Sequence, residues 1–199
     1  MEKLNKKSII DISIMILIAV VAIFFIWNVL VKDSSQSTKT KKSKVSQDDI
    51  LTPEIQQKIM PGVSPVTKEG KVVTPEGKPV RLDVVPGTTE APQLSNPIKN
   101  LEQLPAEAVK LIVTEKGLQP LSFTVKAGGV VNLIITSGDS HMHMFRFKDP
   151  LLSAVEIGPS RGETLAMVFN APEKAGEYEF YCDVPGHENR GEKGKMIVK

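Results

Sequence analysis

The chain contains very few residues that form cross-links or titrate near neutral pH. Its 199 residues include one cysteine, Cys182, and three histidines. A single cysteine cannot form a disulfide within the chain, and a free thiol in an exported protein is prone to oxidation unless it is buried or metal-bound. Aromatic residues make up only 5%, the net charge is +2, and no basic stretch is interleaved with aromatic side chains. This composition excludes a typical nucleic-acid-binding surface, so no nucleic-acid partner is expected.

One long apolar run lies near the N-terminus. Between Ile12 and Leu30 it is interrupted only by Ser13 and Asn28. As a helix it would be roughly 28 Å long, which matches the hydrocarbon core of a bilayer. The run is longer than a usual signal-peptide core and no small-residue cleavage motif follows it, so residues 1–32 are predicted to be an uncleaved transmembrane anchor. A lipid anchor is not expected because the only cysteine is Cys182.

The orientation of this anchor follows from its flanks. Lysines precede and follow the run in similar density, so the charge rule alone does not decide which end is cytoplasmic. The short first segment favours the N-terminus inside the cell. We therefore expect a single-pass protein of the cell membrane with its C-terminal domain extracytoplasmic, either periplasmic or extracellular.

Residues 33–105 form the second region, which is rich in Pro, Lys and Ser. It holds nine of the 14 prolines and begins with a run of Ser, Thr and Lys. Such a composition is typical of chains that do not bury a core, and it predicts a largely disordered linker. Within it, a short helix between Asp48 and Met60 and a loose hairpin between Lys71 and Val85 are the only regular elements expected. Docking of part of the linker onto the following domain stays open.

Residues 106–199 have the texture of an all-β domain, with short apolar runs separated by Gly, Pro, Asn, Asp and Ser. The pattern predicts an eight-stranded Greek-key β-sandwich. The expected strands are Val109 to Thr114, Leu121 to Lys126, Val130 to Thr136, His143 to Phe147, Ala154 to Ile157, Thr164 to Phe169, Gly176 to Cys182 and Gly194 to Val198. Alternation places His143 on the face of Phe145 and Phe147, which points it inward. His141 lies in the preceding turn and is expected to be exposed.

Every histidine and the cysteine fall into two short clusters. His141 and His143 belong to the first, and Cys182 and His187 to the second. One thiolate and two imidazoles are the donors that suit a copper ion in both of its oxidation states. Cys182 ends a predicted strand, and the turn Pro185-Gly186 brings His187 back toward it. Although a lone buried cysteine is usually structural, the two clusters together favour one metal site made of His143, Cys182 and His187.

The domain resembles the cupredoxins, the family of type 1 blue copper proteins. The resemblance rests on Phe123-Thr-Val-Lys-Ala-Gly128, His143-Met-Phe, the middle strands, and above all Gly176-Glu-Tyr-Glu-Phe-Tyr-Cys-Asp-Val-Pro-Gly-His187. It covers residues 106–199, and its ligand loop is similar in length to those of rusticyanin, sulfocyanin and the phytocyanins. The resemblance implies one copper ion that alternates between Cu(I) and Cu(II).

The ligand loop departs from this family at its last position. Where the longer-loop relatives carry an axial methionine or sometimes glutamine, this chain has Glu192. An axial carboxylate would favour Cu(II), lower the reduction potential and make the site less blue. The alternatives are that Glu192 turns to solvent, leaving three ligands, or that Met142 completes the site. Met196 is expected in the core because it alternates with Val198.

Two further features surround the first histidine cluster. Met144 stands where relatives often have asparagine or serine, so a hydrogen bond that would steady the ligand loop is in doubt. The sequence His141-Met-His-Met144 also contains soft donors able to bind Cu(I) transiently, although a turn followed by core residues is the simpler interpretation.

These observations favour an electron carrier over an enzyme. The expected protein is a membrane-tethered mononuclear copper protein that passes single electrons between redox partners, such as membrane respiratory complexes or cytochromes, at the outer face of the cytoplasmic membrane. Two alternatives stay open at this point: a copper-binding carrier or delivery protein, and a metal-free β-sandwich that serves as an interaction module.

Overall fold

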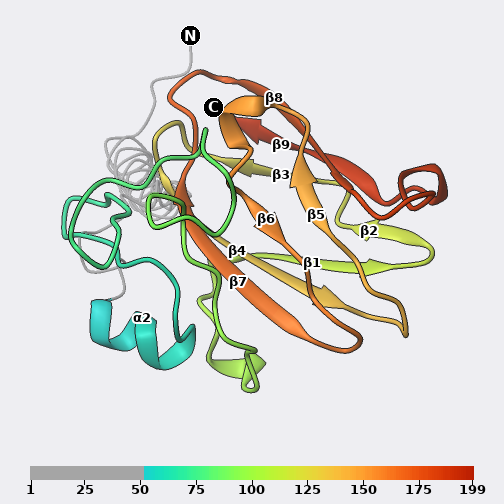
Figure 1. Cartoon of the computed structure of the whole chain (residues 1–199), viewed down its shortest axis with the longest axis horizontal. Coiled ribbons are helices and arrows are strands. Elements are labelled where there is room, and N and C mark those ends of the chain that lie inside the picture. The colour runs from blue at the N-terminus through green and yellow to red at the C-terminus, as the bar shows by residue number, and fades with distance from the viewer. Residues whose placement is uncertain (1–51) are drawn as a thin grey trace, which may run out of the picture. The chain divides into compact units, whose positions relative to one another are not determined.

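The computed structural model describes residues 52–199, and Figure 1 shows them as two packed β-sheets with an irregular segment wrapped around one side. The predicted transmembrane run from Ile12 to Leu30 and the first part of the linker lie outside the described residues. Within residues 52–199, no helix has the length and apolar character needed to cross a bilayer.

The described residues contain one α-helix, three short 3₁₀ helices and nine strands. The helices are α2 (Pro53–Ile59), η2 (Leu101–Gln103), η3 (Pro150–Leu152) and η4 (Glu188–Arg190). The strands are β1 (Val109–Thr114), β2 (Gly117–Gln119), β3 (Ser122–Val125), β4 (Val130–Ser137), β5 (Phe145–Phe147), β6 (Glu156–Ile157), β7 (Thr164–Asn170), β8 (Gly176–Cys182) and β9 (Lys193–Val198).

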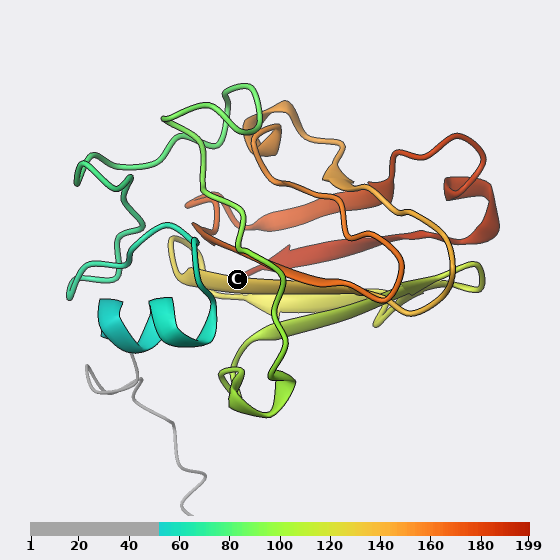
Figure 2. The same cartoon turned by 60° about the horizontal axis from the view of Figure 1, so that its bottom comes forward.

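The strands form two mixed sheets, which Figure 2 shows nearly edge-on as two layers. The first has the order β2-β1-β4-β7 and the second the order β3-β9-β8-β5-β6. Most neighbours are antiparallel, but β1 runs parallel to β4 and β3 runs parallel to β9. The β-sandwich expected from the alternating pattern is therefore confirmed.

The prediction of eight strands is wrong by one, because the described chain has a ninth, β2, where a turn was expected. Gly117 adopts a φ of +117°, a region that favours glycine, and the chain then returns along β1 with Thr114 opposite Gly117. A Cβ atom on Gly117 would lie 2.9 Å from the carbonyl oxygen of Gly191. The small residue thus allows the β1–β2 hairpin to pack directly against the loop between β8 and β9.

The core between the sheets is built mainly from aromatic and branched aliphatic side chains. Phe145, Phe147 and Phe180 form a group with ring centroids 5.1 to 6.1 Å apart. Met196 is fully buried in the same core, as its alternation with Val198 predicted. These contacts hold β5, β8 and β9 in place, and the ends of those strands carry the site described below.

The prediction of a largely disordered linker is wrong for residues 52–105. This segment forms a second cluster of buried apolar residues against the outer face of the first sheet. From the segment come Met60, Val63, Val66, Val72, Ile98 and Leu104, and from the sheet come Ile134, Ala166 and Val168. The segment has too few apolar residues to form a core alone, but the sheet supplies the other half. Composition considered segment by segment could not reveal that shared core.

The same segment also covers the free edge of β7. Ser95 N donates to Ala166 O, and Ala166 N donates to Ser95 Oγ, both at 2.8 Å. Ile98 N donates to Thr164 O at 2.9 Å. Because an uncovered edge strand can pair with other chains, this cover protects the first sheet from edge-to-edge association.

If residues 52–105 belong to the folded domain, shortening a buried side chain there should destabilise the whole domain. We expect Met60→Ala to lower the free energy of unfolding by about 2 to 5 kcal/mol, because Met60 is fully buried. Denaturant unfolding followed by circular dichroism measures this loss. The exposed Ile55 of α2 provides the control, since Ile55→Ala should change stability by less than about 0.5 kcal/mol. Equal, negligible effects of both substitutions would show that the segment does not contribute to the fold.

Candidate metal centre

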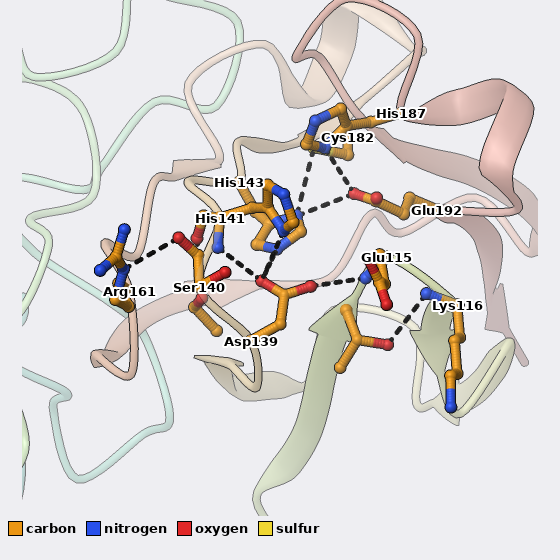
Figure 3. A network of polar contacts seen from close by, with 12 residues as sticks. Glu115, Lys116, Asp139, Ser140, His141, His143, Arg161, Cys182, His187 and Glu192 are labelled. Carbon is orange, nitrogen blue, oxygen red and sulfur yellow. Dashed lines mark hydrogen bonds and ion pairs between the residues drawn. The ribbon is translucent and has the colours of Figure 1, made fainter.

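Cys182 and Glu192 lie at the base of the loop that joins β8 to β9. The register of the two strands ends with Tyr181 opposite Lys193, and Cys182 N then donates to Glu192 O at 2.8 Å. This backbone bond closes the loop and places the two residues side by side. Their side chains point toward the same place (Figure 3).

The loop between Cys182 and Glu192 folds back so that His187 lies beside both of them. His187 N donates to Val184 O at 3.0 Å, with Gly186 at a φ of +84°, which is the arrangement of a tight turn with glycine in its third position. The predicted turn at Pro185-Gly186 is therefore confirmed. The short helix η4 follows, and Gly191 ends it at a φ of +88°, which turns the chain back so that Glu192 N donates to His187 O.

His143 reaches the same place from the neighbouring strand. β5 pairs with β8 so that Phe145 lies opposite Cys182, and His143 comes just before β5. The main chain beyond it is also tied to the thiol, because Met144 N donates to Cys182 Sγ at 3.3 Å and Asp183 N donates to Met144 O at 2.7 Å. Backbone groups of Met144 thus hold the ligand loop, although its side chain is not polar.

The four predicted site residues converge on one point. One ligand atom from each of His143, Cys182, His187 and Glu192 lies within 4.8 Å of the other three. Glu192 Oε2 is 2.8 Å from His143 Nδ1 and 2.9 Å from His187 Nδ1. Cys182 Sγ is 3.4 Å from His187 Nδ1 and 4.0 Å from His143 Nδ1. Figure 3 shows these contacts as a closed group.

All four residues are buried, which is unusual for polar groups. Glu192 is 0% exposed, His143 1%, Cys182 2% and His187 8%. Burying a carboxylate and two imidazoles is costly unless they are paired or bind a metal. The set of one sulfur, two nitrogens and one oxygen is able to hold a copper ion, and each group presents its donor atom to the common point. The alternative in which Glu192 turns to solvent is therefore wrong.

The other residues considered from the sequence lie elsewhere. Met142 is 65% exposed, so its side chain lies in solvent and does not complete the buried site. The side chain of His141 is 46% exposed, as predicted for a turn residue.

The sulfur of Cys182 is not a thiolate in the metal-free protein at neutral pH. Burial raises the pKa of the Cys182 thiol from its ordinary 9.0 to about 11, and the Glu192 carboxylate acts in the same direction. The backbone N–H groups of Met144 and Val184 oppose this increase. Since metals bind the thiolate, binding must release the proton of Cys182.

Two charged residues at this site were missed by sequence reasoning. Arg190 donates from its guanidinium to Glu192 Oε1 at 3.0 Å, which leaves Oε2 facing the two imidazoles. Asp139 Oδ1 lies 3.0 Å from His143 Nε2. A metal-binding histidine usually donates its second ring N–H to such a group, so a carboxylate four residues before His143 was the available signal.

Asp139 is ionised despite being largely buried. Burial acts to raise the pKa of its carboxyl group, but hydrogen bonds from His141 N, from the His143 ring and from Glu115 N outweigh it. The pKa of Asp139 is therefore held well below its usual range.

A two-sheet sandwich with a buried thiol, two imidazoles and a carboxylate at one end has the structure of a small mononuclear metal protein. A model of the cupredoxin-like domain matches residues 93–198 of the chain. This match covers more than half of the sequence, and the chain belongs to the cupredoxin-like domain family. The match begins at residue 93, inside the region predicted to be linker, which agrees with the docking of that segment on the sheet.

Solved structures with similar coordinates include two auracyanins and an amicyanin. The auracyanin of Roseiflexus castenholzii is 19% identical, with 47% of this chain and 98% of that chain covered and a TM-score of 0.41. Auracyanin A of Chloroflexus aurantiacus, described as a "blue" copper protein, is 22% identical, with 46% and 98% covered and a TM-score of 0.38. The amicyanin of Paracoccus versutus is 21% identical, with 52% and 92% covered and a TM-score of 0.39. No curated protein matches the chain.

The raised pKa of Cys182 predicts a pH dependence for the metal-free protein. The folded state holds the thiol proton up to about pH 11, whereas the unfolded chain releases it near pH 9.0. The stabilisation is therefore complete below pH 9.0 and is lost as the pH rises to about 11. Denaturant unfolding of chelator-treated protein should show this loss, and Cys182→Ala should lose less stability over the same range. Parallel curves for the two proteins would contradict the buried, protonated thiol.

Proposed function

We propose that this protein is a membrane-tethered mononuclear copper protein that transfers single electrons between redox partners at the outer face of the cytoplasmic membrane. The observation that carries the proposal is the convergence of four buried donor atoms within 4.8 Å of one another. Copper bound there would supply one reversible electron through its Cu(I) and Cu(II) states. His143, Cys182, His187 and Glu192 are the proposed ligands.

The protein groups around the site suit electron transfer better than catalysis. Four donors from the chain face one point, which leaves no position for a substrate. The donors are held in place by the bond from Met144 N to Cys182 Sγ and the backbone bond from Cys182 N to Glu192 O, so little rearrangement is needed when the charge of the ion changes. Burial excludes water from the sulfur. His187 is the most exposed of the four, at 8%, and its ring edge is the proposed route for electrons.

The membrane location rests on the apolar run from Ile12 to Leu30. With the N-terminus inside the cell, this run would anchor a copper domain on the outer side, near membrane respiratory complexes or cytochromes. Separation of membrane and soluble fractions of cells tests the anchor, and full-length protein found only in the soluble fraction would contradict it.

A copper carrier is the second candidate, because His141 and Met142 offer exposed soft donors just before His143. Such groups could accept Cu(I) from a partner. The burial of the main site argues against this role, since a delivery protein must release its metal readily.

The visible spectrum of the copper-loaded protein tests the proposed site. We expect an intense sulfur-to-copper absorption band in the wild type and its loss in Cys182→Ser, because that band requires a thiolate bound to copper. Metal content measured on the same samples should show about one copper per chain in the wild type.

The alternatives predict different results in the same experiment. Copper that a competing chelator removes within seconds would favour a carrier. Protein that retains no copper and gains no thermal stability when copper is added would favour a metal-free interaction module, because a ligand that binds the native state must stabilise it. A band that persists in Cys182→Ser would rule out the proposed thiolate ligand.

Glu192 should set a low reduction potential if it binds the copper. A carboxylate stabilises Cu(II), so Glu192→Gln should raise the midpoint potential and Glu192→Met should raise it further, since a thioether favours Cu(I). Spectroelectrochemical titration measures the potentials, and electron paramagnetic resonance reports the accompanying change of geometry. Lys195→Gln provides a control, because it removes a charge in β9 whose partner is the exposed Glu177. If both Glu192 variants keep the midpoint potential and spectrum of the wild type, Glu192 is not a copper ligand.

A further inference from the structure

A second carboxylate, that of Asp139, contacts one of the proposed copper ligands on the side away from the other three. His143 presents Nδ1 to Cys182 and Glu192, and its other ring nitrogen, Nε2, lies 3.0 Å from Asp139 Oδ1. A ligand nitrogen that binds a metal cannot carry a proton, so with Nδ1 as the donor the ring proton must sit on Nε2. It is then donated to Asp139 along the contact that a dashed line marks in Figure 3.

Asp139 is itself held in a single orientation. Its Oδ1 also accepts a hydrogen bond from His141 N at 2.8 Å, and its Oδ2 accepts one from Glu115 N at 2.6 Å. Glu115 belongs to the turn between β1 and β2, so this carboxylate connects the first sheet to a ligand on the second. The side chain of Asp139 is only 16% exposed. A fixed and mostly buried charge interacts more strongly with its neighbours than a solvated one.

The two imidazoles are therefore not equivalent. Among the described residues, the hydrogen bonds of the His187 ring are made by Nδ1, to Cys182 and Glu192. The outer nitrogen of His143 faces a carboxylate. A hydrogen-bonded carboxylate makes an imidazole a stronger electron donor and fixes the plane of its ring.

We propose that Asp139 is a positioning residue for His143 and that its negative charge favours Cu(II) over Cu(I) at the site. This inference rests on the proposed copper function. It adds to the ligand set an outer residue that tunes the reduction potential.

The charges around the site support this direction. With Cys182 as a thiolate and the imidazoles neutral, the negative groups Cys182, Glu192 and Asp139 face one positive group among the described residues, Arg190, which leaves a net charge of −2. A divalent ion neutralises this charge, whereas a monovalent ion leaves one negative charge buried. Since an unbalanced buried charge is costly, the surroundings stabilise Cu(II) more than Cu(I). Removing the charge of Asp139 should weaken that preference.

The test compares Asp139→Asn and Asp139→Ala with a matched control, Asp149→Asn. Asp149 Oδ1 accepts a hydrogen bond from Leu151 N at 2.9 Å, the same local contact that Asp139 makes with His141 N. Its replacement removes an equal charge from a loop aspartate that has no contact with a proposed ligand. For each full-length protein the midpoint potential and the affinity for Cu(I) are measured. Together these two values give the affinity for Cu(II).

We expect Asp139→Ala to lower the affinity for Cu(II) by about 10- to 100-fold, as is typical when the outer partner of a metal-binding histidine is lost. The affinity for Cu(I) should fall less, so the midpoint potential should rise. A tenfold difference between the two losses corresponds to about 59 mV for a one-electron couple. Asp139→Asn keeps an acceptor oxygen, so it should raise the potential while changing the affinity for Cu(I) little. Asp149→Asn should match the wild type.

A purely structural role gives a different pattern. If Asp139 only holds the loop, the affinities for Cu(I) and Cu(II) fall by equal factors and the potential of both variants stays at the wild-type value, which would overturn the inference. Thermal unfolding of the metal-free proteins shows whether Asp139→Ala folds. If it does not, Asp139→Asn alone is compared with the wild type. A wild type that binds no copper would instead refute the proposed function, and with it the basis of this inference.

Discussion

The pairing of β8 with β9 is the constraint on which the site depends. These two strands are in register up to the pair Tyr181 and Lys193, and the next backbone contact joins Cys182 to Glu192. Nine intervening residues, 183–191, are thereby forced into a closed loop, and the two glycines with positive φ let the chain turn within it. His187 returns to the base of this loop because its backbone bonds both Val184 and Glu192. A change of register by one residue would turn Cys182 to the opposite face of the sheet.

The second constraint is the cost of burying charge. Glu192 lies fully inside the protein, and its carboxylate is shared between Arg190 on one oxygen and two imidazoles on the other. Asp139 plays a comparable part on the far side of His143. Such groups add little to stability compared with a well-packed apolar core, because desolvation offsets most of their attraction. Their arrangement is better explained by what they present to a metal than by what they contribute to folding.

Much of this architecture could be predicted from local pattern. Alternation placed His143 on the buried face with Phe145 and Phe147, and β1 and β8 begin and end where the sequence indicated. Cys182, His143 and His187 were also identifiable, because this chain has only one cysteine and three histidines, and Glu192 was proposed from its place at the end of the ligand loop. In contrast, β2 was missed, since a strand of three residues after a glycine carries almost no periodic signal. The docking of residues 52–105 was left open by the sequence, because the buried partners of this segment, such as Ile134 and Val168, lie far away along the chain.

Sequence alone determined which donors the protein has, since one cysteine, three histidines and Glu192 leave few combinations, and it placed them at or near the ends of the predicted strands. Tertiary structure decided the rest. It turned Glu192 inward rather than to solvent, left Met142 exposed, and brought Asp139 and Arg190 to opposite sides of the same cluster. The physical reason is that these outcomes depend on strand register and on contacts between distant segments. Neither is encoded in the spacing of residues along the chain.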